Sequence, residues 1–211
     1  FRRVLFRSGN LNNHIGVPLT LLDTPPDADV VVLEMGMNHP GEIACLSRIG
    51  MPTVRLITNV GAAHVEGCGS IAGVAAAKQE LFDDARPGDI LCQNLDDPWI
   101  AAMPLPSGLR CITYGTSPRA TIQLTDVAVD PETLATRLRI ETPDGVVRAR
   151  LQVPGAHLAM NAAAAVAVAY ALRVPVEGLG PALARFAPEG MRNRVERIGE
   201  LLVIEIGRAH V

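Results

Sequence analysis

Residues 29–36 read DVVVLEMG, a continuous apolar run that ends abruptly in a carboxylate and a glycine. Val54–Thr58 and Asp89–Cys92 repeat this pattern, which is typical of strands buried on both faces of a parallel sheet. Two stretches between these runs, Glu42–Ile49 and Ser70–Ala85, predict helices, and the second opens with a serine that can cap it. The alternation of strands and helices predicts an α/β fold with a mainly parallel sheet flanked by helices.

The pattern changes after residue 115. Three short segments alternate between apolar and polar residues and are separated by turn residues: Thr121–Val129, Thr133–Glu141 and Val146–Val153. This pattern predicts a small antiparallel β subsheet. Gly155–Leu172 is rich in alanine and valine on almost every face, and we expect this helix to be buried against the parallel sheet. Leu201–Glu205 is predicted to be one more strand.

The composition is that of one folded domain: 48% of the 211 residues are hydrophobic and 19% are charged. The apolar runs are shorter than the roughly 20 residues of a transmembrane helix. A net charge of -3 gives no reason to expect nucleic acid as a partner. The four cysteines form no Cys-x-x-Cys pair and no secretory signal is present, so we expect reduced thiols and a cytoplasmic location.

Both ends of the chain look foreign to the domain. Residues 1–8 (FRRVLFRS) and 206–211 (IGRAHV) resemble translated adapter sequence, although they could be ordinary termini. We therefore expect one partial domain over residues 9–205.

Polar side chains follow each predicted strand. The carboxyl ends of parallel strands form the edge where ligands bind in open α/β sheets, and here they lead into Glu34, into Thr58 to Gly61 with His64 and Glu66, and into Asn94, Asp96 and Asp97. A carboxylate and an imidazole on neighbouring strand ends suit a divalent cation, and oxygen ligands favour Mg²⁺. Taken singly, Glu34 or His64 could equally be a hydrogen-bonded structural group.

Lys78 is the only lysine in the chain. It falls in the middle of an apolar helical stripe, so its side chain should point inward, with the stripe formed by Ile71, Val74, Ala75, Leu81 and Phe82. From position alone, an amine that reaches water along the stripe or pairs with a nearby acid is the favoured interpretation. A desolvated reactive amine and a carbamylated, anionic metal ligand are the alternatives.

The chain contains no Walker A loop, because Lys78 lies outside the Gly-x-x-x-x-Gly-Lys-Ser/Thr context. Gly67, Gly69 and Gly73 form a glycine-rich stretch, but it does not directly follow a strand. It is therefore a weak dinucleotide fingerprint.

Several spaced motifs cover nearly all of residues 9–205. They are Gly9 to Thr20 (GNLNNHIGVPLT), Glu34-Met35-Gly36, Gly41-Glu42-Ile43, Ile57 to Gly61, Ala63 to Glu66, Ala77 to Glu80, Gly155-Ala156-His157, Asn161-Ala162 and Gly190-Met191-Arg192. Taken in this order, they resemble the Mur ligase family of ATP-dependent amide ligases. The first segment is similar to that of the members that add D-alanyl-D-alanine to UDP-N-acetylmuramoyl-tripeptide in peptidoglycan synthesis.

The resemblance implies a role for individual residues. Glu34, His64 and Lys78 match catalytic, Mg²⁺-binding positions, with Lys78 acting as a carbamate. Asn161 and Arg192 match ATP-binding positions. Asn10, Asn12 and Asn13 would lie on the phosphate and substrate side. ATP and Mg²⁺ are the implied cofactors, the two peptidoglycan precursors are the implied partners, and a monomer is expected.

Two departures from the family pattern affect what this chain can do. Leu158 stands where many relatives carry a further asparagine, and the family's P-loop would precede Gly9. The implied mechanism is phosphorylation of the tripeptide carboxylate by ATP, followed by attack of the dipeptide amine on the acyl phosphate. We expect this polypeptide alone to be inactive. Another amide ligase of the same superfamily and a non-catalytic nucleotide-binding module are the alternatives.

Overall fold

The computed structural model describes residues 4–5, 11–187, 194–198 and 201–205. The chain divides into two compact units. The first comprises Phe1–Gln93 with Asp97–Cys111, and the second comprises Asn94–Asp96 with Ile112–Val211. Each unit is described by itself.

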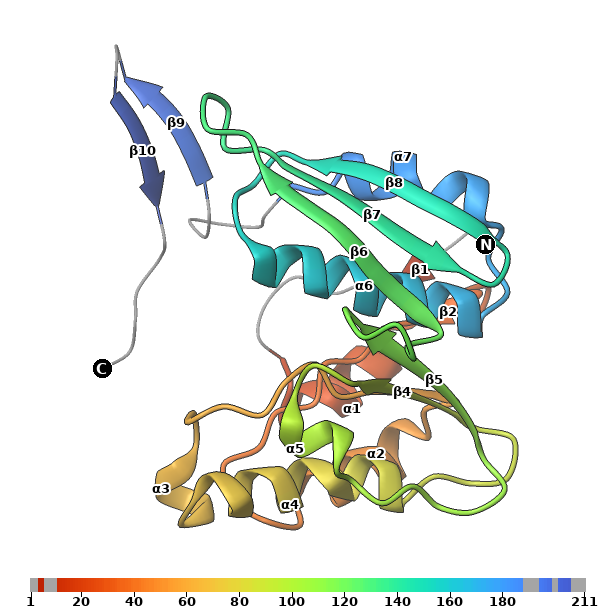
Figure 1. Cartoon of the computed structure of the whole chain (residues 1–211). Helices are drawn as coiled ribbons and strands as arrows, with labels where there is room; N and C mark the ends of the chain where they lie inside the picture. The colour runs from red at the N-terminus through yellow and green to blue at the C-terminus, as the bar shows by residue number, and fades with distance from the viewer. Residues whose placement is uncertain (1–3, 6–10, 188–193, 199–200, 206–211) are drawn as a thin grey trace. The chain divides into compact units, whose positions relative to one another are not determined.

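The first unit has helices around short parallel strand pairs (Figure 1). Its elements are β1 (Val4–Leu5), α1 (Gly16–Leu22), β2 (Val30–Val31), α2 (Glu42–Gly50), β3 (Val54–Leu56), α3 (Val65–Cys68), α4 (Ile71–Asp83), β4 (Ile90–Asn94, whose last residue belongs to the second unit) and α5 (Pro98–Ala101). Val54 of β3 pairs with Ile90 of β4 in parallel register. The strands and helices predicted in this unit are therefore confirmed. β2 and β3 are shorter than predicted, whereas β4 extends two residues further, to Asn94.

The strand β2 differs from the prediction in its pairing. It contains only Val30 and Val31, and it pairs in parallel with Val4 and Leu5 of β1. These two residues belong to the segment 1–8, whose foreign origin remains a prediction. Both β2 residues are half-buried and Val32 is exposed, so the prediction of a strand buried on both faces was wrong for this run. An apolar run predicts a strand but not its neighbour, because the pairing depends on residues distant in sequence.

The second unit is mainly antiparallel. Its elements are β5 (Arg110–Gly115, which begins in the first unit), β6 (Ile122–Val129), β7 (Thr136–Thr142), β8 (Gly145–Leu151), α6 (Ala156–Ala171), a 3-10 turn (Val176–Gly178), α7 (Leu179–Ala184), β9 (Arg194–Ile198) and β10 (Leu201–Glu205). β5 and β6 are parallel, whereas β6, β7 and β8 form the predicted antiparallel subsheet and β9 pairs antiparallel with β10.

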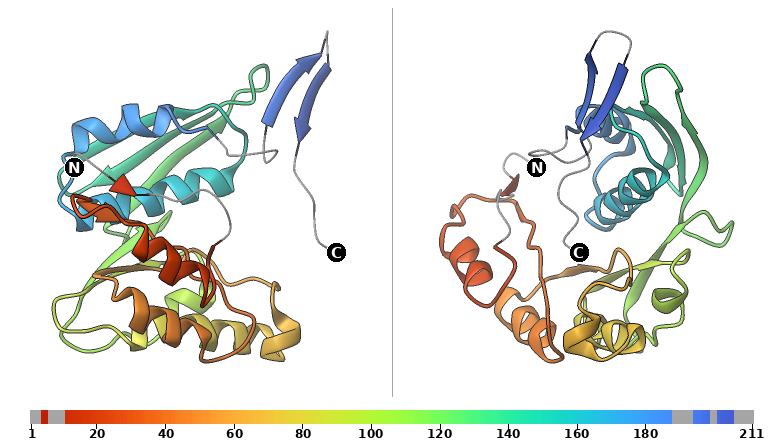
Figure 2. Two further views of the ribbon diagram at one scale, coloured as in Figure 1. Left: turned by 180° about the vertical axis from the view of Figure 1, so that it is seen from behind. Right: turned by 90° about the vertical axis from the view of Figure 1, so that its left-hand side faces the viewer.

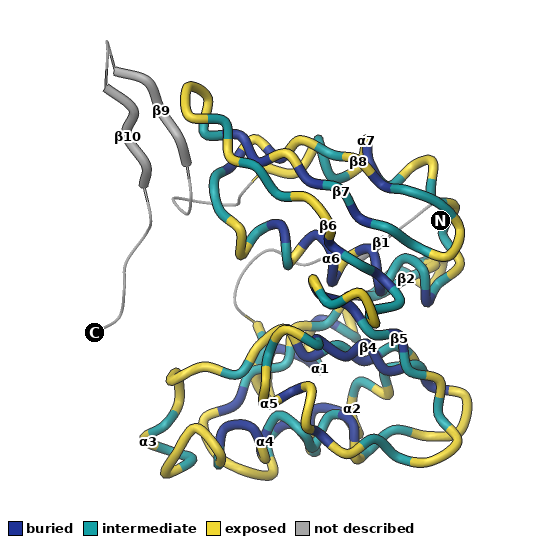
Figure 3. Tube along the Cα trace, viewed as in Figure 1, coloured by how far each residue is buried: buried dark blue, intermediate teal, exposed yellow. Residues whose placement is uncertain are grey.

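Helices α6 and α7 lie on the same face of the β6–β8 sheet (Figure 2). The sequence predicted that the apolar helix packs on the parallel strands, whereas α6 contacts β6 and β7. About half of its residues are buried, in stretches along the helix (Figure 3). A helix that is apolar on nearly every face can be buried against any sheet, so its composition does not select the strands.

The core of the first unit consists of two apolar clusters. One contains Ile57, Ala75, Phe82, Leu91, Ile100 and Met103. The other contains Met37, Ile43, Val74 and Ala77. Helix α4 contributes residues to both clusters. Because α4 is packed in this way, its Lys78 lies near the loop after β3.

A charged group is also buried in this unit. Arg55, at the centre of β3, is 1% exposed. Its guanidinium donates to Asp89 at 2.9 Å, to the Ser47 hydroxyl at 2.6 Å and to the Leu81 carbonyl oxygen at 2.9 Å. This network joins β3 to α2, to α4 and to the residue that precedes β4.

Candidate functional site

Glu34 follows β2 and is exposed. One of its carboxylate oxygens accepts a hydrogen bond from the Asn12 side-chain amide at 2.8 Å. The Asn12 carbonyl oxygen in turn accepts from the Gly36 backbone N–H at 2.7 Å. A Cβ atom at Gly36 would lie 2.7 Å from the Asn12 amide nitrogen, so a larger residue there would displace the Asn12 side chain. Two predicted site residues, Asn12 and Glu34, are thus brought together.

Asn13 has a local structural role. Its side-chain oxygen accepts from the backbone N–H groups of Ile15 at 3.0 Å and Gly16 at 2.9 Å. These contacts satisfy donors at the start of α1, as an N-terminal cap does. The substrate-binding role of Asn13 remains a prediction.

His64 precedes α3 and adopts a left-handed backbone conformation with φ +66°. Its Nδ1 atom lies 3.1 Å from the side-chain oxygen of Asn38, in the loop before α2. A positive φ is uncommon for residues other than glycine and is concentrated at turns and functional sites. The imidazole is exposed, so it can be reached by a ligand.

Lys78 is half-buried on α4. Its amine donates to the carbonyl oxygen of Asn59, at the loop after β3, at 2.5 Å. Burial lowers the pKa of this amine from its usual value, and the negative charge of Asp97 opposes that shift. The lysine therefore points inward, and a smaller free-energy cost separates it from its neutral, nucleophilic form.

Asp97 supports the loop that accepts this lysine. One carboxylate oxygen accepts from the Val60 backbone N–H at 2.7 Å, next to Asn59. The other accepts from the N–H groups of Trp99 and Ile100, both at 3.0 Å, and so caps α5. A single carboxylate thus joins the start of α5 to the loop that holds the Lys78 acceptor.

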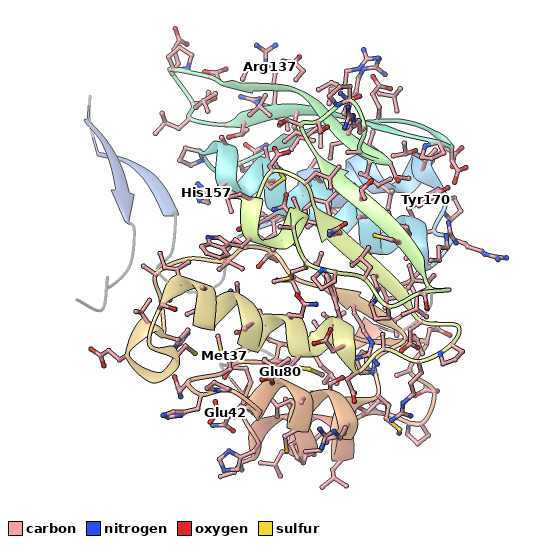
Figure 4. All side chains as sticks on the ribbon, turned by 60° about the horizontal axis from the view of Figure 1, so that its bottom comes forward. Met37, Glu42, Glu80, Arg137, His157 and Tyr170 are labelled. Carbon is pink, nitrogen blue, oxygen red and sulfur yellow. The ribbon has the colours of Figure 1, made fainter. Side chains whose placement is uncertain are left out.

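Glu80 holds the start of α2 against α4. Its two oxygens accept from the backbone N–H groups of Gly41 at 2.6 Å and Ala44 at 3.0 Å. Met37, Glu42 and Glu80 gather where the segment before α2 meets α4 (Figure 4). Ser70 caps α4 through the Gly73 N–H, as predicted.

The three candidate metal-binding residues have different partners: Glu34 contacts Asn12, His64 contacts Asn38 and Lys78 contacts Asn59. Within the described residues, no group of three or more histidine, cysteine, aspartate or glutamate side chains is placed to hold a metal ion. A cation here would need oxygen atoms from phosphate or water to complete its shell, which is how Mg²⁺ commonly binds.

The remaining predicted residues lie elsewhere. Asn161 is an exposed residue of α6 in the second unit. Asn10 and Arg192 lie outside the described residues. In the part of the chain that the structure describes, no helix is long and apolar enough to cross a membrane.

Three residues of this region were not predicted as site residues from the sequence: Asn38, Glu80 and Asp97. Asp97 follows the third predicted strand and was noted there. Glu80 lies two positions after Lys78, on the same helix. Asn38 had no periodicity or charge signal, because its importance depends on the approach of α3 to the loop before α2.

The fold and these motifs together define a domain class. Residues 3–169 match the model of the Mur ligase middle domain. The chain belongs to the Mur ligase family.

Sequence and structural relatives are more specific. The UDP-N-acetylmuramoyl-tripeptide--D-alanyl-D-alanine ligase of Escherichia coli strain K12 is 36% identical over 181 residues, which are 85% of this chain and 40% of the relative. The crystal structure of MurF from Acinetobacter baumannii matches with a TM-score of 0.89 and 30% identity, over 96% of this chain and 44% of that one. MurF from Thermotoga maritima in complex with ADP matches with a TM-score of 0.83 and 26% identity, over 97% of this chain and 47% of that one.

The chain spans about two fifths of the length of the curated relatives that it matches. The mainly parallel α/β architecture with an antiparallel subsheet agrees with the matched MurF structures.

Proposed function

We propose that the protein to which this chain belongs is an ATP-dependent ligase that adds D-alanyl-D-alanine to UDP-N-acetylmuramoyl-tripeptide, in the cytoplasm and as a monomer. The relatives named for this activity support the substrates, and the ADP complex of a MurF relative supports the nucleotide. The single observation that carries the proposal is Lys78, a half-buried amine with a lowered pKa, held at the loop after β3.

The residues of the first unit fit a Mg²⁺ ion bound together with nucleotide phosphates. Glu34 offers an exposed carboxylate and His64 an exposed imidazole. Mg²⁺, when bound, would neutralise charge on the phosphoryl group that is transferred from ATP to the tripeptide carboxylate. The hydrogen bond from Asn12 holds the Glu34 carboxylate in one orientation. The carboxylate therefore need not be ordered during the reaction.

Lys78 can contribute only after a change of charge, because an ammonium group repels a cation. Its neutral amine can form an N–C bond to carbon dioxide and lose a proton, which yields an anionic carbamate with two oxygen ligands. The lowered pKa favours the neutral amine that this step requires. The Asn59 carbonyl and Asp97 would keep the group at the loop after β3.

Asn161, Arg192, Asn10 and Asn13 complete the proposed assignment. The first two would contact ATP, and the asparagines near the start of the chain would lie near phosphate and substrate. These roles rest on the positions of the residues in the family motifs.

The test of the proposed function is ADP release by the protein encoded in the uninterrupted gene. Release should require both UDP-N-acetylmuramoyl-tripeptide and D-alanyl-D-alanine, whereas the 211-residue chain alone should release none. Release that requires a single amino acid in place of the dipeptide would instead identify another amide ligase of the superfamily. Substrate-dependent release by the 211-residue chain would contradict its predicted inactivity.

Carbamylation of Lys78 can be tested separately. At high bicarbonate, ¹³C NMR with labelled bicarbonate should reveal one lysine carbamate signal, because the chain contains one lysine. Lys78→Arg should abolish this signal, which also distinguishes it from a carbamate on the terminal amine. A wild-type spectrum identical to that of the variant would contradict the proposed modification.

A further inference from the structure

The contact between Asn38 and His64 determines which imidazole nitrogen can bind a ligand. The Asn38 side-chain oxygen lies 3.1 Å from His64 Nδ1, and an amide oxygen can only accept a hydrogen bond. Nδ1 must therefore carry the proton, which leaves the lone pair of the neutral ring on Nε2. Within the described residues the His64 imidazole has no second hydrogen-bond partner, so Nε2 is available to a ligand.

The backbone of Asn38 is fixed against the helix that His64 begins. Its carbonyl oxygen faces Gly67, where a Cβ atom would lie only 1.9 Å away, so a larger residue at position 67 would force the two segments apart. The Cys68 thiol also contacts this oxygen at 3.7 Å. Asn38 and His64 therefore belong to two segments whose separation is set by a close backbone approach.

Carboxylates fix the other side of the same loop. Glu42 accepts from the backbone N–H groups of Asn38 at 2.5 Å and His39 at 3.1 Å. Glu80 accepts from Gly41, three residues beyond Asn38, at 2.6 Å. Because Glu80 is two residues from Lys78 on α4, the helix that carries the lysine also holds the loop that carries Asn38.

A purely structural purpose explains this contact poorly. Both side chains are exposed, and an exposed hydrogen bond contributes only about 1 kcal/mol or less to folding. His64 also pays for its left-handed conformation, which costs on the order of 1–3 kcal/mol in a residue other than glycine. The arrangement stabilises the fold little, yet it fixes the direction of one imidazole.

We propose that Asn38 is a positioning residue that holds His64 in the Nδ1–H tautomer and directs Nε2 toward a divalent cation. The part of this inference that concerns the cation rests on the proposed function. The part that concerns the tautomer rests on the geometry alone. Metal-binding histidines commonly donate their second N–H to an oxygen acceptor, and loss of that acceptor weakens metal affinity about 10–100-fold.

The tautomer can be measured by long-range ¹H–¹⁵N correlation of the ¹⁵N-labelled chain. At about pH 8 an ordinary histidine, with a pKa of about 6.5, is mostly neutral. The ¹⁵N chemical shifts of the neutral ring then distinguish Nδ1–H from Nε2–H. Wild-type His64 should be in the Nδ1–H form. Asn38→Asp, which keeps an acceptor oxygen, should preserve it, and Asn38→Ala should lose it.

His39→Gln is the matched control, since it changes the same loop without touching the His64 contact. His14, which has no hydrogen-bond partner among the described residues, provides the internal reference spectrum. A wild-type His64 in the Nε2–H form overturns the proposal, as does an Nδ1–H form that persists in Asn38→Ala. Both results are independent of any metal.

Mn²⁺ alone is the probe for the cation. It should broaden the His64 signals of the wild type, with an apparent affinity about tenfold or more lower in Asn38→Ala and unchanged in His39→Gln. If the Nδ1–H tautomer depends on Asn38 but Mn²⁺ affects no His64 signal, the metal role in the proposed function fails, as does the direction of Nε2 toward a cation. The tautomer assignment then stands by itself.

Discussion

Asp89→Asn should destabilise the first unit strongly, because it removes the negative charge that faces a buried arginine. Arg55 is 1% exposed and Asp89 accepts from two of its nitrogens, at 2.9 and 3.2 Å. Breaking a buried ion pair by removing one partner costs about 3–5 kcal/mol. In the variant, Arg55 still donates hydrogen bonds to the Ser47 hydroxyl and the Leu81 carbonyl oxygen. A carboxylate oxygen of Asp84 also lies 3.9 Å from the Arg55 guanidinium. We therefore expect the lower end of that range, about 3 kcal/mol.

Urea unfolding followed by tryptophan fluorescence is the appropriate assay. Trp99 is the only tryptophan in the chain and belongs to the first unit, so its emission reports on the unit that contains Arg55. With a slope of about 2 kcal/mol per molar urea, a loss of about 3 kcal/mol lowers the midpoint by about 1.5 M.

Arg48→Gln provides the matched control. Its side chain is 69% exposed and its ion pair with Asp84 is long, at 3.8 Å. Loss of such a surface pair costs about 1 kcal/mol or less. An unfolding midpoint for Asp89→Asn that equals that of Arg48→Gln would refute the reasoning. Burial of the ion pair would then make no difference to its contribution to stability.

Two further predictions follow from the pKa shifts. Asp97→Asn should lower the pKa of Lys78 further, because the Asp97 charge opposes the effect of burial; a ¹³Cε-lysine label gives one signal to titrate, and an unchanged or higher pKa would count against the contact. Glu42 has a pKa lowered by hydrogen bonds from the Asn38 and His39 backbone, so the folded chain loses this proton more readily than the unfolded one. The contribution of Glu42 to folding stability is therefore present above its unfolded-state pKa of 4.5 and is lost as the pH falls through its folded-state pKa. The stability difference between wild type and Glu42→Gln should shrink over this range, and a difference that stays constant with pH would contradict the assignment.

Much of the fold could be predicted from local patterns. The apolar runs at Val54–Thr58 and Asp89–Cys92 identified β3 and β4, and the alternating segments after residue 120 identified β6, β7 and β8. The short elements α1, α3 and α5 escaped prediction, since helices of four to seven residues depend on tertiary packing more than on propensity. Arg55 was likewise hidden within an apolar run, because only its network explains how the strand can bury a charge.

The sequence by itself determined which chemical groups the strand ends and helices carry: an isolated lysine on an apolar stripe, with carboxylate, amide and imidazole groups after successive strands. Those features are local, because strand ends and helical faces follow from the pattern of neighbouring residues. Only the tertiary structure decided which groups meet. Asn38 reaches His64, Glu80 reaches the start of α2, and Asp97 supports the Asn59 carbonyl that accepts Lys78. Each pair joins residues distant in the chain, and their contact arises from the packing of α2, α3, α4 and α5 around the two apolar clusters of the first unit.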